Sequence, residues 1–510
     1  MTYLFSSKQC LLFICAFALS GCGSSETPVA QNPTPAPITP TTNTLTLQNG
    51  PTQIACDGKT FPAQWVWGEN GNAASGQAQA ATSGTPKIEQ YRAGKLVATY
   101  SHFGYSGVTS NENTGTSVDP SGGAFSRQPY RQFAEGDEYR VYPAVYEGET
   151  QQPWIGPMTA SYAEFQQGIF QAPKNIKIIG MTVNGVRPVI RLPATGASNN
   201  TLGQGLIYFD KSENITFENF DVDSNSSGAV GKAAIYINGA KNLTLRNLRI
   251  RGFKTQDANS IFGTDNNSGT LRLENIELFD NGGGNGPEHN IYIGASKLDS
   301  NFTVHMTGSY SHSAYYGHLF KSRAQKNILE GNYFRGTLGG AQQAENYLVD
   351  VPNGGVLTMR NNVLVKNASG DNSNGLMVTF KMEGATDTRP DAITIEHNTF
   401  VAYSRYYDSQ QHPLAPYSFF YPSKNPAAAD FPVANVRVRG NAYVGLCQHG
   451  ASELNYRGTD YIEGWFDVLN NDFSLKGLAA VAQGSATLSP SYNFPIGVAT
   501  RVGNQIGARD

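Results

Sequence analysis

Short apolar runs recur along the middle of the chain, separated by polar and turn-forming residues. Four of these runs read LIYF, AIYI, NIYI and LFKS. Apolar and polar positions that alternate with a period of two predict short β-strands with one buried face. The third residues of the runs are Tyr208, Tyr236, Tyr292 and Lys321, which lie 28, 56 and 29 residues apart. The chain therefore repeats a unit of about 28 residues.

The same spacing extends this set of third residues, here called the outer column. Thr264 takes the place between the second and third runs, and Asp350 and Thr379 follow the fourth at intervals of 29 residues. Ile291 and Phe320 precede two of these positions and are apolar, so we expect them inside. The outer column is then expected to point outward, with its members about 5 Å apart on neighbouring strands.

Asparagines form a second series, each placed just before a short apolar strand. Its members are Asn219, Asn247, Asn275, Asn332, Asn362, Asn398 and Asn441. Gly308 stands near the place where one more asparagine is due. At the same bend of successive strands, an amide side chain can bond the equivalent amides above and below it. We therefore expect one asparagine ladder.

Composition agrees with a β-structure, because 55 Gly, 26 Tyr and 26 Phe favour many short strands joined by turns. A repeat of this length, made of three short strands, fits a parallel β-helix in which each repeat is one coil. The arrangement resembles the right-handed parallel β-helix superfamily of pectate lyases, polygalacturonases and related polysaccharide enzymes. The resemblance implies an all-β fold, a right-handed parallel β-helix (solenoid) of roughly ten or more coils.

The β-helix is expected over residues 136–450. An N-terminal cap region is expected at 48–135 and a C-terminal cap or tail at 451–510. Residues 22–47 are rich in Pro and Thr and lack apolar bulk, so we expect a tether there rather than a core. The boundaries divide the chain into one repetitive body with flanking segments.

The first residues carry an export signal. Lys8 precedes an apolar run at 10–19, which ends in LSGC. This pattern predicts a signal peptide at residues 1–21. LSGC resembles the bacterial lipobox, which implies a lipid anchor on Cys22. Gly23 after that cysteine implies retention at the outer membrane, facing the periplasm or the exterior. Cys56 and Cys447 remain downstream, and their pairing is left open.

The net charge of −3 disfavours nucleic acid as a partner, since no basic stripe is available to release counterions. The expected partners are a polysaccharide and, through the lipid, a membrane, with the protein itself a monomer. No zinc-type spacing occurs in the sequence, and no cofactor is evident from it, although a calcium ion is left open.

The stretch GHLFKSR, residues 317–323, concentrates cationic chemistry in a chain with only 15% charged residues. Lys321 stands between Tyr292 and Asp350 in the outer column, and we expect it to face an open groove lined by both. Tyr208 and Tyr236 extend this face as sugar-binding tyrosines. The alternative is a solvated face on which a Lys–Asp pair happens to stack.

His289 and His318 are equivalent positions 29 residues apart, at the start of two strands. They form either a stack of polar core residues or part of the cleft beside Lys321. Arg323 is outward by parity and can hold a carboxylate. Together these residues suit β-elimination at a uronate, in which the carboxylate is neutralised and a base removes the neighbouring C5 proton.

Two further resemblances point to a polyuronate. KSRAQKNILEGNYF is similar to the Lys-Ser strand of β-helix alginate and chondroitin lyases, which implies Lys321 as the base. Those enzymes carry an arginine one coil later, where this chain has Asp350. The segments 286–289 and 317–323 loosely resemble mannuronan C5-epimerases. The function expected is a polysaccharide lyase that cleaves a uronate-containing glycan.

Two other classes stay open. A hydrolase needs a pair of carboxylates, for which Asp350, Glu345 and Glu383 are the candidates in this region. A glycan-binding surface protein would use the tyrosines and the cations without turnover, because fold alone does not decide function.

Overall fold

The computed structural model describes part of the chain. The described residues are 53–56, 59–62, 78–104, 126–129, 134–147, 174–192, 205–225, 232–254, 258–283, 288–294, 302–336, 344–366, 377–383, 390–402, 406–407, 413–414, 420–421, 436–439, 441–444, 465–467 and 472–476. The chain divides into Met1–Asn43 and Thr44–Asp510, and every described residue belongs to the second unit. The predicted signal peptide, Cys22 and most of the tether lie outside the described residues, as does Cys447.

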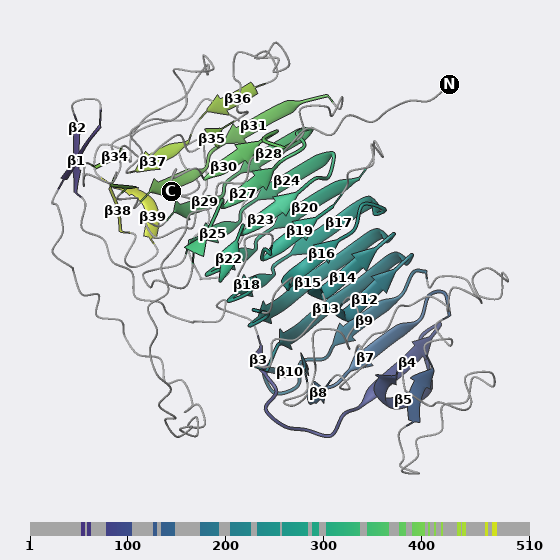
Figure 1. Ribbon diagram of the computed structural model, residues 1–510. Helices are drawn as coiled ribbons and strands as arrows, with labels where there is room; N and C mark the ends of the chain where they lie inside the picture. The colour runs from purple at the N-terminus through teal and green to yellow at the C-terminus, as the bar shows by residue number, and fades with distance from the viewer. Residues whose placement is uncertain are drawn as a thin grey trace, which may run out of the picture. The chain divides into compact units, whose positions relative to one another are not determined.

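The described secondary structure is entirely β-strand. Within these ranges no helix is long and apolar enough to cross a membrane. Successive strands of the middle of the chain stack in sequence order, from β9 to β31 (Figure 1). The all-β class expected from composition and from the apolar runs is therefore confirmed.

One sheet has eight strands, and every neighbouring pair in it is parallel. Its strands are β12 (Gly205–Asp210), β14 (Ala233–Asn238), β16 (Asn259–Gly263), β19 (Ile291–Ile293), β23 (Phe320–Ser322), β27 (Val349–Val351), β30 (Val378–Phe380) and β35 (Phe420–Tyr421). The four apolar runs of the sequence lie in β12, β14, β19 and β23.

The second sheet has 21 strands and contains two parallel ladders. The first ladder is β7 (Glu138–Val141), β9 (Lys177–Gly180), β13 (Glu213–Asp223), β15 (Lys241–Arg251), β17 (Ser268–Glu274), β20 (Thr303–Thr307), β24 (Lys326–Glu330), β28 (Val356–Arg360), β31 (Ala392–Glu396) and β36 (Val436–Arg439). The second is β8 (Val145–Glu147), β11 (Val189–Arg191), the ends of β13 and β15, β18 (Glu277–Phe279), β21 (Tyr310–His312), β25 (Tyr333–Arg335), β29 (Val363–Lys366), β32 (Thr399–Ala402) and β37 (Ala442–Val444). The long strands β13 and β15 join the two ladders.

A two-stranded antiparallel hairpin adjoins the first ladder. It consists of β4 (Ile88–Arg92) and β5 (Lys95–Gly104), and β4 pairs antiparallel with β7. β6 (Ser126–Pro129) pairs with β5. The remaining strands form small two-stranded sheets: β1 (Gln53–Cys56) with β2 (Lys59–Pro62), β3 (Gln79–Ala80) with β10 (Val186–Arg187), β22 (Tyr316–Gly317) with β26 (Ala344–Glu345), β33 (Tyr406–Tyr407) with β34 (Pro413–Leu414), and β38 (Trp465–Asp467) with β39 (Asp472–Lys476).

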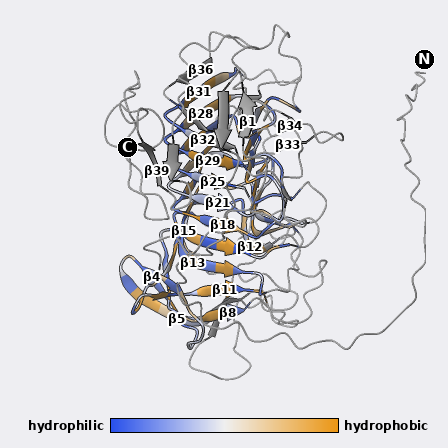
Figure 2. Ribbon diagram, turned by 90° about the vertical axis from the view of Figure 1, so that its left-hand side faces the viewer, coloured by the Kyte–Doolittle hydropathy of each residue, from blue (hydrophilic) through white to orange (hydrophobic). Residues whose placement is uncertain are grey.

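Each repeat thus supplies one strand to the eight-stranded sheet and one to each ladder of the larger sheet. Long parallel sheets built this way are compatible with a coiled solenoid, although the sheets formed by the described strands are not closed. Figure 2 shows apolar and polar stretches alternating along the stacked strands.

The inward face of the eight-stranded sheet is apolar along its length. Ile235, Ile261 and Ile291 pair in register, as do Phe320 and Val349, and all five side chains are fully buried. The prediction from strand parity is confirmed for this face. Removal of such side chains from water is the main stabilising contribution to a fold of this kind.

The outer column differs from its prediction at one place. Phe262, not Thr264, pairs with Tyr236 on one side and with Tyr292 on the other. Thr264 lies two residues further on, where its hydroxyl donates to Asn238 Oδ1 at 2.8 Å. The error arose because equal repeats of 28 were assumed, whereas the two successive repeats here are of unequal length.

The asparagine series is two ladders rather than one. Asn219, Asn247 and Asn275 have left-handed backbones, with φ of 69°, 51° and 52°. The register places Gly308 and Gly331 at the same bend, with φ of 55° and 64°. This column therefore selects residues that tolerate positive φ, which accounts for the glycine at 308.

The later asparagines occupy the next position along the chain and are buried. Asn332 Nδ2 donates to Asn362 Oδ1 at 3.0 Å, Asn362 Nδ2 to Asn398 Oδ1 at 2.9 Å, and Asn398 Nδ2 to Asn441 Oδ1 at 3.0 Å. All four side chains are fully buried. The expected amide-to-amide bonding is confirmed for this inner asparagine ladder.

Candidate functional site

An aromatic stack leads along the eight-stranded sheet toward Lys321. The Tyr236 and Phe262 rings lie 5.5 Å apart at 5°, and the Phe262 and Tyr292 rings 5.1 Å apart at 18°. Tyr208 meets Tyr236 edge to face at 4.8 Å. Because the stacked rings cover one another's faces, a ligand outside the sheet meets ring edges and hydroxyl groups. All four rings are partly exposed.

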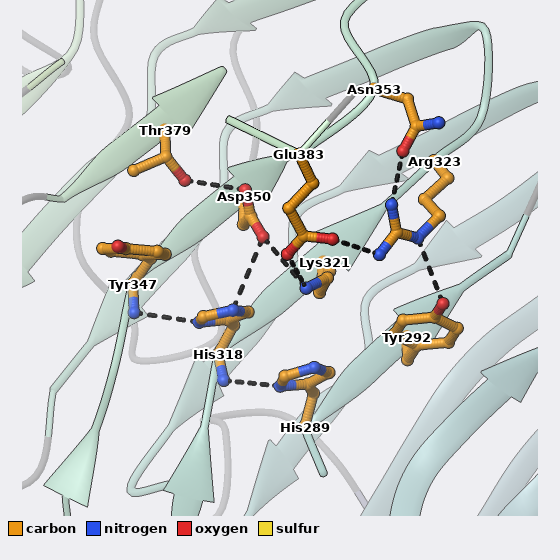
Figure 3. A network of polar contacts seen from close by, with 10 residues as sticks. All are labelled: His289, Tyr292, His318, Lys321, Arg323, Tyr347, Asp350, Asn353, Thr379 and Glu383. Atoms are coloured by element: carbon orange, nitrogen blue, oxygen red, sulfur yellow. Dashed lines mark hydrogen bonds and ion pairs between the residues drawn. The ribbon is translucent and has the colours of Figure 1, made fainter. Parts of the chain in front are cut away.

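Lys321 lies in β23 between Tyr292 and Asp350, as the repeat predicts. Its ammonium nitrogen is 2.8 Å from Glu383 Oε1 and 3.4 Å from Asp350 Oδ2. Figure 3 shows both carboxylates converging on this nitrogen. Lys321 is therefore a bridge between two carboxylates that come from different repeats.

The expected open face is found only in part. The aromatic members of the outer column are partly exposed, but Lys321 is 7% exposed, Asp350 1% and Thr379 0%. The prediction that Lys321 faces an open groove is wrong for this state of the protein. Parity correctly gave the direction of the side chain, but the Glu383 and Arg323 side chains, which cap it, cannot be anticipated from parity.

Arg323 lies beside Lys321 and bonds three partners. Its Nε donates to the Tyr292 hydroxyl at 3.1 Å, and its two other nitrogens donate to Asn353 Oδ1 and Glu383 Oε2 (Figure 3). Arg323 thus holds a carboxylate, as expected, through one of its terminal nitrogens. The Glu383 carboxylate is bound at one oxygen by Lys321 and at the other by Arg323.

His289 and His318 form a stack that also belongs to the site. Their rings lie 4.4 Å apart at 8°, and Tyr347 stacks on His318 at 4.9 Å. The backbone N–H of His318 donates to His289 Nδ1 at 2.8 Å, and that of Tyr347 to His318 Nδ1 at 3.0 Å. In the neutral ring the proton is therefore on Nε2. His318 Nε2 faces Asp350 Oδ2 at 3.4 Å.

The two open interpretations of the histidines are thus both correct in part. Backbone bonds fix the rings as a polar stack, and one ring reaches the acid that adjoins Lys321. Gly317 makes this approach possible, because its φ is +75° and an added Cβ would lie 1.7 Å from the Glu288 carbonyl oxygen. A side chain at 317 would displace the turn that delivers His318.

Burial and charge move the pKa values of the two carboxyl groups in opposite directions. Burial raises the pKa of Asp350, although Lys321 and the Thr379 hydroxyl, which donates to it at 2.7 Å, act against this. Partial burial would also raise the pKa of Glu383, but hydrogen bonds from Lys321 and Arg323 hold it below its usual value. Asp350 is therefore the more readily protonated of the two acids.

Desolvation lowers the pKa of both histidines well below 6.5, and the positive charge of Lys321 adds to this. A histidine that is neutral in the folded protein takes up a proton on unfolding once the pH falls below about 6.5. Stability is then lost as the pH falls from that value toward the folded pKa, at up to about 1.4 kcal/mol per pH unit for each ring.

The variant His289→Asn tests this pH dependence. The Asn Oδ1 can take the place of Nδ1 as acceptor for the His318 N–H, but it does not titrate. Below pH 6.5 the unfolding free energy of the wild type should fall faster than that of the variant, by up to about 1.4 kcal/mol per pH unit. Urea unfolding at several pH values measures both slopes, and parallel slopes would contradict a buried neutral His289.

The remaining candidates divide clearly. Glu383 joins the cluster, whereas Glu345 is fully buried and pairs with Lys366, whose nitrogen is 3.7 Å away. Tyr208 and Tyr236 lie in the aromatic stack, separated from Lys321 by Phe262 and Tyr292. Phe262 and Asn353 were not predicted as site residues. Asn353 follows Asp350 by three residues, and only a loop conformation brings it to Arg323.

No group of three or more His, Cys, Asp or Glu side chains able to hold a metal ion occurs in the described part of the chain. Comparison of the chain with protein-family models, with curated proteins and with solved structures finds no match. Inference about function therefore rests on the site itself.

Proposed function

We propose that the protein is a right-handed parallel β-helix that acts on an acidic polysaccharide, as a lyase that cleaves beside a uronate by β-elimination. The observation that carries this proposal is the position of Lys321. It lies next to an arginine and a tyrosine hydroxyl, between an acid of raised pKa and one of lowered pKa, at the end of an aromatic stack. The three parallel ladders support the β-helix.

The proposed reaction needs a charge partner, a base and an acid. Arg323 neutralises the uronate carboxylate, so that negative charge can build up on it. Lys321 first passes its ammonium proton to Asp350, whose raised pKa favours uptake, and the free amine then takes the C5 proton. The electron pair of that C–H bond forms the C4–C5 double bond as the C4–O bond breaks. The Tyr292 hydroxyl gives its proton to the leaving oxygen.

A glycoside hydrolase is the second candidate, because the pKa values of Asp350 and Glu383 are moved apart as an acid and a nucleophile or base require. Asp350 is only 1% exposed, however, and Lys321 lies between it and Glu383. A substrate would meet Glu383, Arg323 and Tyr292 before Asp350, which favours the lyase.

Incubation with alginate, pectate, hyaluronan and chondroitin separates these functions. A lyase produces ultraviolet absorbance from the new double bond conjugated with the carboxylate. New reducing ends without that absorbance would indicate a hydrolase, and affinity without either would indicate a binding protein. Each assay is run with and without a calcium chelator, because calcium dependence is open.

We also propose that the protein is a monomeric outer-membrane lipoprotein anchored at Cys22. Cells that express the wild type should incorporate labelled fatty acid into the protein and keep it in the membrane fraction. Cys22→Ser should abolish the label, since the thioether-forming sulfur is lost, whereas Cys56→Ser should retain it. A label that persists in Cys22→Ser would place the lipid elsewhere or remove the anchor from the proposal.

A further inference from the structure

We propose that Lys321 and Arg323 form a binding site for a ligand carboxylate, which the side chain of Glu383 occupies in the ligand-free protein. An incoming uronate carboxylate takes the place of Glu383 instead of adding beside it. The identity of the ligand as a uronate rests on the proposed function, but the carboxylate site itself rests only on the contacts of Glu383.

The burial of the four charged groups is uneven. The side chains of Asp350, Lys321 and Arg323 are 2%, 9% and 18% exposed, whereas that of Glu383 is 46% exposed. Glu383 is therefore the outermost member of the cluster and the one that solvent reaches. A buried charge is costly to leave unpaired, so the two cations need a carboxylate at this place at all times.

The geometry of the contact is that of a bound carboxylate. Lys321 Nζ contacts Oε1 at 2.8 Å, and Arg323 Nη2 donates to Oε2 (Figure 3). Arg323 is oriented from behind by the Tyr292 hydroxyl and by Asn353 Oδ1. Two cations from one strand segment thus hold one oxygen each, a pattern that fits any carboxylate that can reach it.

Exchange keeps the charges balanced. Lys321 and Arg323 are opposed by Asp350 and Glu383, two positive charges against two negative ones. A uronate added beside Glu383 would place a third anion in the cluster, which is unfavourable in a poorly solvated site. A uronate that replaces Glu383 leaves the sum unchanged.

Only the Glu383 side chain needs to move. Its backbone N–H donates to the Pro352 carbonyl at 3.1 Å, and Lys381 in the same short segment pairs with Asp391 at 2.6 Å. The segment after β30 is therefore anchored on both sides of the exchange. Rotation of an exposed glutamate is fast and small compared with rearrangement of a backbone segment.

Acetate is the simplest probe of an exchangeable carboxylate. Glu383→Ala should lower the thermal unfolding midpoint, because Lys321 and Arg323 lose a partner. Sodium acetate should restore it in a saturable way, relative to sodium chloride at equal ionic strength. Glu213→Ala is the matched control, because Glu213 also binds two cations, Lys241 at 2.9 Å and Lys174 at 3.3 Å, in an open setting. It should show no saturable acetate response.

Glu383→Gln tests the same site in a variant of nearly unchanged shape. By calorimetry it should bind D-glucuronate about tenfold or more tightly than the wild type, since an internal competitor bound by ionic hydrogen bonds has been weakened. Neutral glucose should show no such gain. Unchanged or weaker glucuronate binding in this variant, or a Glu383→Ala midpoint that is indifferent to acetate, would overturn the proposal.

Failure of the lyase is distinguishable from failure of this site. Acetate rescue and tighter glucuronate binding, with no ultraviolet product from any polymer, would support the carboxylate site and remove the lyase. An active wild type whose Glu383 variants ignore both probes would overturn the site and leave the lyase standing.

Discussion

Lys321→Ala should reduce kcat/KM on the polymer that the wild type cleaves by about 10²- to 10⁴-fold, the usual contribution of a positioned acid or base. The proposal makes Lys321 the group that receives the C5 proton, and no other described amine contacts both Asp350 and Glu383. The initial rate of ultraviolet absorbance measures this directly. The variant is expected to fold, because Asp350 can take up a proton when its charge partner is lost.

The control for this experiment lies in the same repeat. Lys326 is exposed at the start of β24, five residues further along the chain, and Lys326→Ala removes an equal charge from the surface. It should keep wild-type kinetics. If Lys321→Ala retained more than about a tenth of the wild-type kcat/KM, Lys321 would not be the base. Tyr292 would then be the group to test next.

Asn362→Ala should lower the unfolding free energy by about 3 kcal/mol or more, the largest stability effect that we expect from one side chain. Asn362 Oδ1 accepts from the backbone N–H of Asn332 at 2.9 Å and from its amide at 3.0 Å, while Nδ2 donates to Leu329 O and Asn398 Oδ1. Truncation leaves these buried groups without those bonds and opens a cavity. Urea unfolding gives the difference.

An exposed asparagine ladder provides the comparison. Asn242 Nδ2 donates to Asn214 Oδ1 at 3.0 Å, and its backbone φ is +57°. Asn242→Gly removes the amide without strain, and the loss should stay below about 1 kcal/mol because water replaces the bond. Equal losses at 242 and 362 would mean that burial does not set the strength of the inner asparagine ladder.

Much of the fold was accessible from the sequence because the repeat acts on one strand at a time. Alternation identified the strands of the eight-stranded sheet, and the apolar residue before each column position correctly marked the interior, as Ile291 and Phe320 demonstrate. Spacing failed where repeat lengths differ, so that Thr264 was assigned in place of Phe262. Pairing register depends on where turns lengthen, which periodicity alone does not specify.

The asparagine series shows a second limit. Residue type alone merged two adjacent positions, because an asparagine suits both a left-handed bend and a buried amide ladder. Asn275 and Asn332 therefore looked equivalent, although the first has φ of 52° and the second is buried one position further on. The site was limited in the same way. The repeat placed Lys321 beside Asp350, but Glu383 reaches them from a turn.

The hairpin of β4 and β5 has a consequence for how molecules of this kind meet. A stack of parallel strands ends in a row of unsatisfied amide and carbonyl groups that invites further chains to add, as in a growing fibre. Here that row on β7 is taken by antiparallel β4, and the outermost described strand beyond β5 is the four-residue β6. β6 ends in Pro129, which has no amide hydrogen to offer. The order that stacks one repeat on the next is thereby kept within a single molecule.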